Sequence, residues 1–291
     1  MADITLEKFI SLLPHIVSKN TSLSPAWSEE NLLLGQCAVV STLAQFHLGG
    51  EMRRASLTGT PFADMGSHYW NVLGDGTEID FTEEQFLGNK PVFTEYATRT
   101  PAYVLSNERT KLRFKELSFN LAKILDPENN LFEDLIYRAG FDAAIDLPCQ
   151  KMKFGSVAVY QGNQILATAY NDHNPVTKDL CEPRCIRFDI PSRTESMIGG
   201  CDHAEELVMD KVREIGVSLK EISIYIVGLD QKNLPWMRTE AEHTCIRCSS
   251  QMYRAKVGSI VVPVKDKGWV NISPQAALES AKLYALQIKQ P

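Results

Sequence analysis

Two short stretches decide the fold of this chain: Cys201-Asp202-His203-Ala204-Glu205 and Thr244-Cys245-Ile246-Arg247-Cys248. Each stretch leads into a helical pattern of apolar residues, which predicts helices over 203–215 and 245–256. Between them, the β-branched run 222–227 predicts a buried strand. Strands that alternate with helices indicate an α/β sheet, so we expect both stretches to lie where a helix begins.

The residue types in these stretches are those of a metal site. His203, Cys245 and Cys248 offer one imidazole and two thiolates, and cysteines three positions apart face the same way on a helix. The partial positive charge at a helix N-terminus stabilises the thiolate, which is the form that binds metal. Three protein ligands leave the fourth position of a tetrahedral zinc ion open, as in catalytic sites. Glu205 is then near enough to move the protons of a zinc-activated water without being a ligand.

The surrounding sequence predicts further strands and helices. Phe154–Tyr160 and Gln164–Tyr170 form a predicted hairpin that turns at Gln161-Gly162-Asn163. Ser259–Val264 predicts another strand, and Pro274–Gln287 predicts a closing helix. The order predicts an α/β domain, a three-layer sheet with helices on both faces.

A domain boundary is expected at Asp126-Pro127-Glu128-Asn129-Asn130, which are turn and helix-start residues. Helical patterns lie on both sides of it, at 106–124 with Ser106 as the expected N-cap, and at 131–147. At roughly 150 residues per domain, a chain of 291 residues has room for two domains. We therefore divide it into residues 1–127 and residues 128–291.

Residues 150–265 resemble the zinc-dependent cytidine deaminase superfamily, and above all its deoxycytidylate deaminase branch. The resemblance is carried by the H-x-E and C-x-x-C motifs and by three strings: Ala169-Tyr170-Asn171, Cys181-Glu182-Pro183-Arg184-Cys185-Ile186-Arg187 and Ile190-Pro191-Ser192. It implies a zinc ion, a proton shuttle at Glu205, and contact of Asn171 with the nucleotide. On residue type alone, Asn171 is equally well a turn residue that ends a strand.

Two features depart from the family pattern. Thr244 replaces the proline that usually precedes the first cysteine, and we expect it to cap the helix. An insertion at 228–243 carries Trp236 and must lie near the metal, because both of its ends do. Trp236 is a candidate for stacking on a base, although packing within its own domain is the simpler interpretation.

Three further cysteines, Cys181, Cys185 and Cys201, lie close to the metal motifs in the sequence. Together with a fourth ligand such as His173 they could hold a second, structural zinc ion. The alternative is that all three are small buried residues, since no second C-x-x-C motif is present. Both interpretations stay open.

The first half of the chain carries a second constellation. Gly35-Gln36-Cys37 precedes an apolar helix that ends at Gly49-Gly50, so Cys37 is expected at a helix N-terminus, where the thiolate is favoured. This position suits a nucleophile.

A predicted hairpin supplies possible partners for this cysteine. Residues 67–73 and 77–81 flank Gly74-Asp75-Gly76, a three-residue turn. With that turn, Trp70 lies opposite Asp80, and His68 becomes a diagonal neighbour of Asp80 on the same face. Cys37, His68 and Asp80 would then act as nucleophile, base and orienting acid.

Residues 28–90 resemble small bacterial proteins of papain-like fold that carry G-Q-C, H-Y-W-N and D-G-x-E-x-D. The resemblance implies an α+β domain with a Cys-His-Asp hydrolase site. The alternative is a scaffold that covers the deaminase pocket or mediates dimerisation, with Cys37 an ordinary buried cysteine.

Composition narrows the remaining possibilities. The chain is 44% hydrophobic and 23% charged, which is typical of globular proteins. Its net charge of −6 lacks the basic excess of duplex-binding proteins. Seven cysteines are present, most of them near the metal motifs, and indicate metal or catalytic sites rather than a disulfide framework. Because no secretory or membrane-spanning stretch is evident, we expect a cytoplasmic protein without a membrane partner.

These patterns together predict a zinc-dependent hydrolytic deaminase that acts on a nucleobase, with Zn²⁺ as cofactor. The inserted loop and the added domain favour cytosine in single-stranded nucleic acid, which is the substrate we expect. Free deoxycytidylate is the alternative, which the acidic charge favours. A zinc-retaining binding module without activity is the alternative of another class, which the presence of Glu205 disfavours. We expect the chain to form a homodimer.

Overall fold

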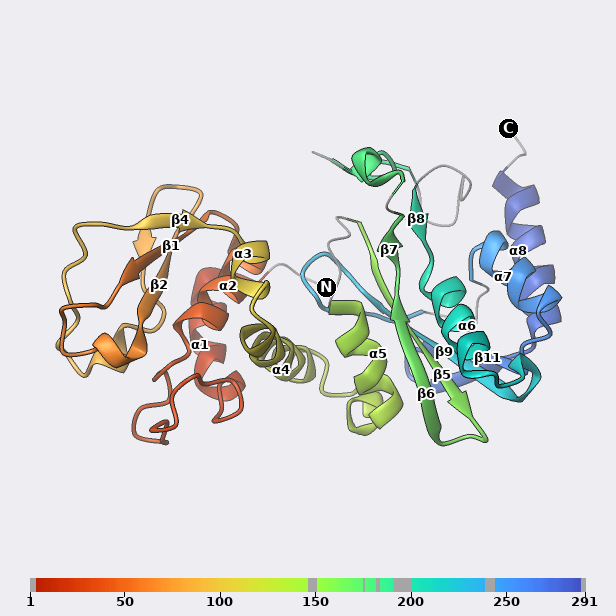
Figure 1. Cartoon of the computed structure of the whole chain (residues 1–291), viewed down its shortest axis with the longest axis horizontal. Helices are drawn as coiled ribbons and strands as arrows, with labels where there is room; N and C mark the ends of the chain where they lie inside the picture. Colours follow the sequence, from red (N-terminus) through yellow and green to blue (C-terminus); the bar gives the residue numbers. More distant parts are fainter. Residues whose placement is uncertain are drawn as a thin grey trace. The chain divides into compact units, whose positions relative to one another are not determined.

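The computed structural model describes residues 4–145, 151–174, 176–181, 184–190, 200–238 and 244–288. The chain forms two compact units, Met1–Leu125 and Asp126–Pro291 (Figure 1). Within the described residues, no helix is both long and apolar enough to cross a membrane.

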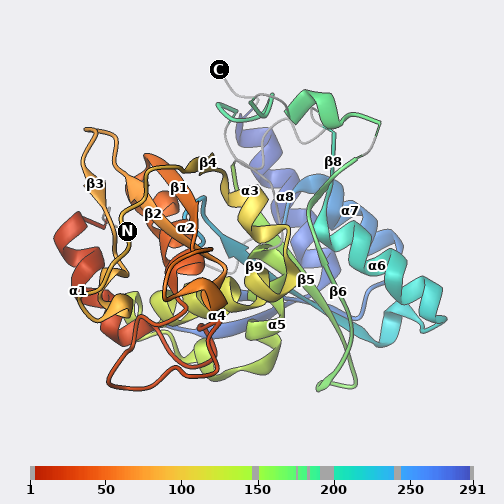
Figure 2. The same ribbon diagram turned by 60° about the vertical axis from the view of Figure 1, so that its left-hand side comes forward.

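The first unit combines helices with a small antiparallel sheet. Its helices are α1 (Leu6–Ile16), α2 (Cys37–Leu48), α3 (Pro101–Leu105) and α4 (Glu108–Leu125). The sheet has the strand order β3 (Glu78–Ile79), β2 (Ser67–Val72), β1 (Glu51–Ser56) and β4 (Ala97–Arg99). Helix α2 contacts both β2 and α4, which explains why its sequence is apolar on most sides (Figure 2).

The predicted hairpin and its register are confirmed. The Leu73 amide donates to the Thr77 carbonyl at 2.8 Å, and Asn71 pairs with Ile79. The same register brings Trp70 opposite Asp80, as the turn chemistry of the sequence indicates. The side chains of His68 and Asp80 consequently meet.

The start of α4 differs from the prediction. The helix begins at Glu108, and the Asn107 side chain accepts the Thr110 amide at 3.0 Å, so Asn107 and not Ser106 caps it. Ser106 instead ends α3, where its hydroxyl donates to the Tyr103 carbonyl. A short separate helix had no distinct periodicity in the sequence.

The second unit is built on a six-stranded sheet. Its strand order is β12 (Gly268–Ile272), β11 (Ser259–Val264), β9 (Ile222–Leu229), β5 (Lys153–Tyr160) and β6 (Gln164–Tyr170), and β10 (Pro235–Trp236) pairs with the end of β9. Strands β9 and β11 are parallel and the other pairs are antiparallel. The predicted strands are all present, and β10 and β12 are additions.

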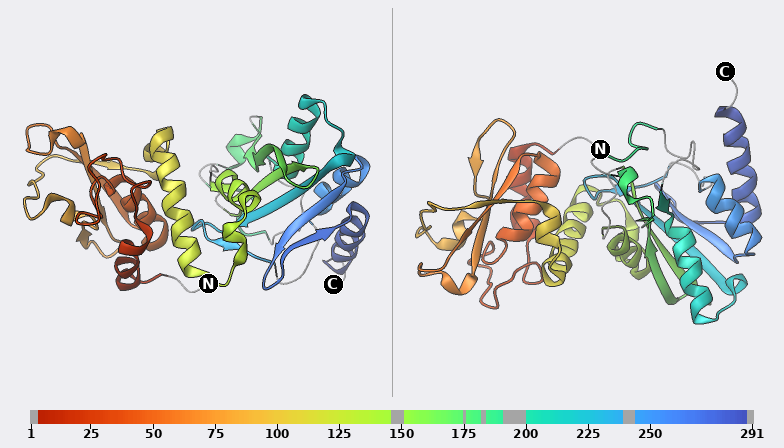
Figure 3. Two further views of the ribbon diagram at one scale, coloured as in Figure 1. Left: turned by 90° about the horizontal axis from the view of Figure 1, so that it is seen from below. Right: turned by 45° about the horizontal axis from the view of Figure 1, so that its top comes forward.

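Helices cover both faces of this sheet (Figures 1 and 3). Helix α5 (Leu135–Ile145) packs on one face, whereas α6 (Ala204–Ile215), α7 (Ile246–Arg254) and α8 (Pro274–Ile288) lie on the other. A Cβ atom on Gly155 of β5 would come within 2.0 Å of the Gly140 carbonyl of α5, so this helix approaches closely because both residues lack side chains. The three-layer α/β architecture is confirmed.

The face that carries α6 and α7 holds the main core of this unit. Ile224 and Ile226 of β9 pack there with Val208 of α6 and Met252 of α7. Cys248 belongs to the same buried cluster. The packing of this core therefore fixes where α6 and α7 begin relative to one another.

Candidate metal centre and a second polar cluster

The beginnings of α6 and α7 carry the predicted metal ligands. His203 is the N-cap residue of α6, and Cys245 is the N-cap residue of α7. The Cys245 sulfur accepts the Cys248 amide at 3.4 Å. Thr244 is therefore not the cap; its hydroxyl group lies 2.9 Å from that of Ser249. A cysteine takes the capping role because its sulfur is already directed at the first turn.

The three donor atoms converge on one point. The Nδ1 atom of His203 lies 3.1 Å from the Cys248 sulfur and 3.3 Å from the Cys245 sulfur. All three donor atoms lie within 4.8 Å of one another. In a tetrahedral zinc site, nitrogen and sulfur ligands lie about 3.5 Å apart. The donor set and its spacing therefore fit zinc.

The two thiols differ in their ease of ionisation. Hydrogen bonding with Cys248, aided by His203 and opposed by burial, lowers the pKa of Cys245 to about 4. Burial raises the pKa of Cys248 well above its ordinary value. One thiolate is thus already stabilised, and a zinc ion held here would bind the other sulfur as a thiolate as well.

Two adjacent carboxylates on α6 have different surroundings. Burial, together with the negative charge of Cys245, raises the pKa of Glu205. Glu206 accepts the backbone amide of His203 at 3.1 Å and the Arg247 Nε at 2.6 Å, so it joins α6 to α7. The sequence analysis missed Glu206, although a glutamate three residues after an N-cap is a known sign of a capping box.

Asn171 and Trp236 both make contacts within their own unit. The Asn171 side chain accepts the Phe154 amide at 2.6 Å and donates to the Met152 carbonyl at 3.4 Å. Trp236 lies half-buried, with its ring edge-to-face on Phe154 at 6.0 Å between ring centroids. Their contacts with a substrate remain predictions.

Arg238 is a further residue that the sequence analysis missed. Its side chain is buried, and its guanidinium lies 5.6 Å from the centroid of the Trp236 ring. Its positive charge also lowers the pKa of Glu205, against the larger effect of burial. The Arg238 guanidinium therefore interacts with both the Trp236 ring and the Glu205 carboxylate. No local sequence pattern indicates this role of Arg238.

The predicted second zinc site is not assembled among the described residues. There, His203, Cys245 and Cys248 form the one group of at least three ligand atoms close enough for a metal. Strand β8 (Cys201–Asp202) pairs with β7 (Asp172–His173), which brings Cys201 opposite His173. Parts of the segment that carries Cys181 and Cys185 lie outside the described residues, so the second site stays a prediction.

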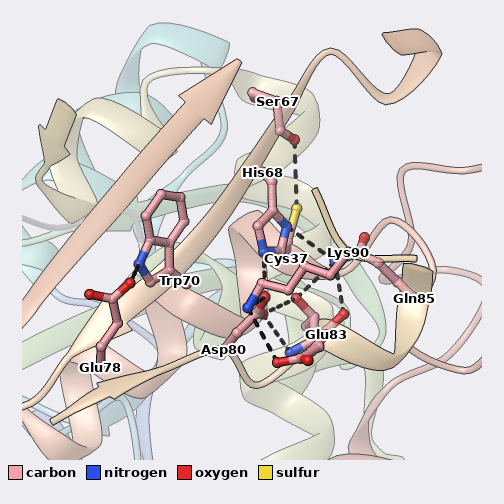
Figure 4. Close-up of polar contacts among 10 residues, drawn as sticks. Cys37, Ser67, His68, Trp70, Glu78, Asp80, Glu83, Gln85 and Lys90 are labelled. Atoms are coloured by element: carbon pink, nitrogen blue, oxygen red, sulfur yellow. Dashed lines mark hydrogen bonds and ion pairs between the residues drawn. The ribbon is translucent and has the colours of Figure 1, made fainter. Parts of the chain in front are cut away.

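The first unit assembles the second predicted constellation (Figure 4). Cys37 is the first residue of α2, and His68 lies on β2. The Nε2 atom of His68 lies 2.7 Å from a carboxylate oxygen of Asp80. The structure therefore brings the three residues together.

Two family models match the chain, one in each unit. Residues 5–126 match the model described as YunG protein, and residues 134–264 match the cytidine and deoxycytidylate deaminase zinc-binding region. The uncharacterized protein YunG of Bacillus subtilis (strain 168) is 30% identical over 95 residues, which is 32% of this chain and 75% of that protein. The crystal structure of the dCMP deaminase of cyanophage S-TIM5 in apo form is 17% identical, covers 53% of this chain and 85% of that chain, and superposes with a TM-score of 0.26.

The family match over residues 134–264 agrees with the geometry of the second unit, where His203, Cys245 and Cys248 form a group that could hold a metal ion. Zinc is accordingly the metal of this centre, and the unit is of zinc-dependent deaminase type. The match of the first unit gives a family name and no activity. The chain belongs to the YunG family through its first unit and carries a cytidine and deoxycytidylate deaminase zinc-binding region in its second.

Proposed function

We propose that the second unit removes the exocyclic amine of cytosine by hydrolysis, with His203, Cys245 and Cys248 as zinc ligands and Glu205 as the catalytic acid and base. One observation carries this proposal. The three donor atoms lie within 4.8 Å of one another, and the buried carboxylate of Glu205 follows His203 by two residues. A bound zinc ion supplies a Lewis acid that makes water acidic enough to act as a nucleophile near neutral pH.

Glu205 performs the proton transfers in this proposal. Its carboxylate takes one proton from the attacking water and delivers it to the ring nitrogen. It then takes the second proton from the hydroxyl group formed on the ring carbon and delivers it to the leaving amine. The C–N bond to the amine breaks, ammonia leaves, and a carbonyl remains on the ring. Burial of Glu205 keeps bulk water from competing for these protons.

The two candidate substrates, free deoxycytidylate and cytosine in a single strand, predict different contacts for Trp236. A strand needs an aromatic face for a flanking base. Trp236 instead packs on Phe154 and approaches Gly228, where an added Cβ would lie 3.0 Å from its ring. This packing and the net charge of −6 favour the free nucleotide over the single strand that we expected from the sequence.

The test is a parallel assay of the zinc-loaded full chain on deoxycytidylate and on a cytosine-containing DNA strand, with ammonia and uracil products quantified. We expect turnover of deoxycytidylate, and a loss of about 10²–10⁴-fold in Glu205→Gln, because an amide cannot carry the proton. Glu214→Gln, at an exposed position on the same helix, is the matched control and should keep full activity.

Turnover of the strand alone would show that the substrate is single-stranded nucleic acid and not free deoxycytidylate. Absence of turnover on both substrates by a zinc-loaded protein would favour the non-enzymatic binding module. Wild-type rates in Glu205→Gln would remove this residue from the mechanism.

A further inference from the structure

The first unit contains a buried polar cluster that deamination does not use. Cys37 lies at the start of the 12-residue helix α2, and its sulfur lies beside the His68 imidazole (Figure 4). The Ser67 carbonyl oxygen lies 3.9 Å from the same sulfur. The thiol is therefore held between a helix N-terminus and a histidine on the neighbouring strand.

Asp80 fixes the orientation of that histidine. One carboxylate oxygen of Asp80 lies 2.7 Å from His68 Nε2 and 2.9 Å from the Lys90 ammonium. The other accepts the Thr82 amide at 3.0 Å and its hydroxyl at 3.2 Å. Because the carboxylate engages Nε2, the other ring nitrogen, Nδ1, is left on the side of Cys37 and Gln85 (Figure 4). This is the arrangement of a base that an acid orients.

The ionisation of the pair is consistent with that arrangement. Burial alone lowers the pKa of His68, but hydrogen bonds and charges from Asp80 and Cys37 raise it to about 9. Burial alone raises the pKa of Asp80, yet His68 and Lys90 outweigh it and lower that pKa. The imidazole is thus readily protonated while the carboxylate stays ionised.

Aromatic rings hold the imidazole in place. Trp70 and Phe93 stack on His68 with centroid distances of 5.9 and 5.5 Å, and Phe86 meets it edge-on at 4.9 Å. Gln85 contributes a polar contact to the Nδ1 atom at 3.2 Å. A ring so packed has little rotational freedom, which suits a base that must keep one orientation.

A positively charged residue of α4, Arg113, also interacts with Cys37. The buried Arg113 guanidinium donates to the carbonyls of Gly35 and Thr21 at 3.3 and 3.4 Å. Burial lowers the pKa of Arg113, and the charge of Cys37 acts in the opposite direction, so the two groups interact. The Arg113 guanidinium therefore lies beside the N-terminus of α2, where Cys37 begins the helix.

A purely structural cysteine would need none of these groups, since a buried thiol packs as a small hydrophobe. The side chain of His68 has no exposed surface and that of Asp80 is 2% exposed. Burying such an ion pair costs desolvation energy that packing alone does not require. We propose that Cys37, His68 and Asp80 form a second active site, which transfers an acyl group from an ester or amide to water.

Before the reaction the proton of the Cys37 thiol resides on His68, and the sulfur then forms a bond to the carbonyl carbon of the substrate. The bond from that carbon to the alcohol or amine breaks, and His68 protonates the leaving group. Water then adds to the thioester, the carboxylic acid leaves, and the thiol is restored. The Cys37 backbone N–H, which an α-helix leaves unpaired in its first turn, is placed to stabilise the oxyanion.

The experiment uses the zinc-loaded full chain and 4-nitrophenyl acetate as the acyl donor. We expect a burst of 4-nitrophenolate, followed by steady turnover, and an acetyl group on Cys37 when the reaction is quenched and mapped by mass spectrometry. Mapping is needed because the chain has seven cysteines. This wild-type measurement needs no variant and so does not depend on the folding of one.

Variants then assign the roles of the partners. His68→Gln should slow acetylation by about 10²–10⁴-fold, and Asp80→Asn should slow it and move the pH dependence of the rate, which a merely structural role would not do. Asp64→Asn, an exposed carboxylate in the same unit, is the control and should acetylate at the wild-type rate. Circular dichroism establishes that each variant is folded.

Acetylation confined to other cysteines, or acetylation of Cys37 at the same rate in folded His68→Gln, would overturn the proposal. The outcome is separable from deamination, because Glu205→Gln should keep full acetylation of Cys37. Conversely, Cys37→Ala should keep full deaminase activity.

Discussion

Both units place a cysteine at the start of a helix and bring a histidine to it, but they surround the pair differently. In the second unit, His203 directs one nitrogen at two sulfurs, at 3.1 and 3.3 Å. In the first unit, His68 faces a single thiol and holds Asp80 with its other nitrogen at 2.7 Å. The same two residue types thus serve two kinds of site.

The difference lies in what completes the pair. A second thiol three positions along the helix, at Cys248, supplies another soft ligand and makes a metal site. A carboxylate on the far side of the imidazole instead orients a base and stabilises its protonated form. The partner of the histidine, rather than the helix N-terminus, therefore decides between metal binding and nucleophilic chemistry.

The largest effect is expected from breaking the ligand set. Cys248→Ser should lose zinc and reduce deamination to background, because a neutral hydroxyl is a poor zinc ligand and Cys248 lies in the core. Metal analysis of freshly purified protein should give about one tightly bound zinc in the wild type and none in the variant. Cys37→Ala is the matched control, since it removes the helix-starting cysteine of the other unit and should leave the zinc content unchanged.

A zinc content unaffected by Cys248→Ser would show that this thiol is not a ligand. A second equivalent of zinc in the wild type, lost on replacing Cys201, would instead support the second site predicted from Cys181, Cys185 and Cys201.

The next effect concerns pH and the first unit. The folded pKa of His68, at about 9, lies above its ordinary value of 6.5, so protonation stabilises the folded state. Its contribution is complete below about pH 6.5 and disappears as pH rises through about 9; a shift of this size amounts to about 2–3 kcal/mol near neutral pH. The charged groups that face this histidine are Asp80, Cys37 and, through Asp80, Lys90.

Urea unfolding at pH 6, 7.5 and 9.5 measures this contribution. The free energy of unfolding of the first unit should fall toward pH 9.5 in the wild type, and the fall should be much smaller in Asp80→Asn, which removes the charge that stabilises the imidazolium. Equal pH dependence in both proteins would contradict the assignment.

A smaller loss is expected from Glu206→Gln, the neighbour of the catalytic candidate. Glu206 accepts the backbone N–H of His203 and pairs with Arg247 at 2.6 Å. Losing a charged hydrogen-bond acceptor costs about 1–3 kcal/mol. The melting temperature of the second unit should fall, while deamination by the folded protein stays far above that of Glu205→Gln. Activity as low as in Glu205→Gln would place Glu206 in the chemistry.

The sequence alone predicted those site residues whose positions depend on a turn or on a helix pattern a few residues away. The turn at 74–76 fixed the register that joins His68 to Asp80, and the two helix patterns fixed His203 and Cys245. These predictions succeeded because turn length and apolar periodicity act over a few residues.

The residues that sequence did not predict act across long distances in the chain. Lys90 reaches Asp80, and Arg113 approaches Cys37 from another helix, through packing that no periodicity encodes. Strand β10 is only two residues long, too short for an alternating pattern, so the insertion that carries Trp236 was expected to be a loop. Because β10 pairs with β9, Trp236 packs within its own unit, and we no longer expect it to stack on a base.

The smallest effect on activity is expected from Trp236→Ala. The ring packs on Phe154 and lies beneath the Arg238 guanidinium, so its removal should cost about 1–3 kcal/mol of stability. Because Arg238 in turn acts on Glu205, deamination of deoxycytidylate and of a strand should fall by similar small factors.

The comparison is made as the ratio of kcat/KM values for the two substrates in wild type and variant. Stacking on a flanking base is worth about 1–3 kcal/mol, a loss of roughly 5- to 150-fold that would appear on the strand alone. A selective loss of that size would reverse the preference for the free nucleotide and make Trp236 a contact for polymer substrates, whereas equal losses identify it as a residue that supports Arg238.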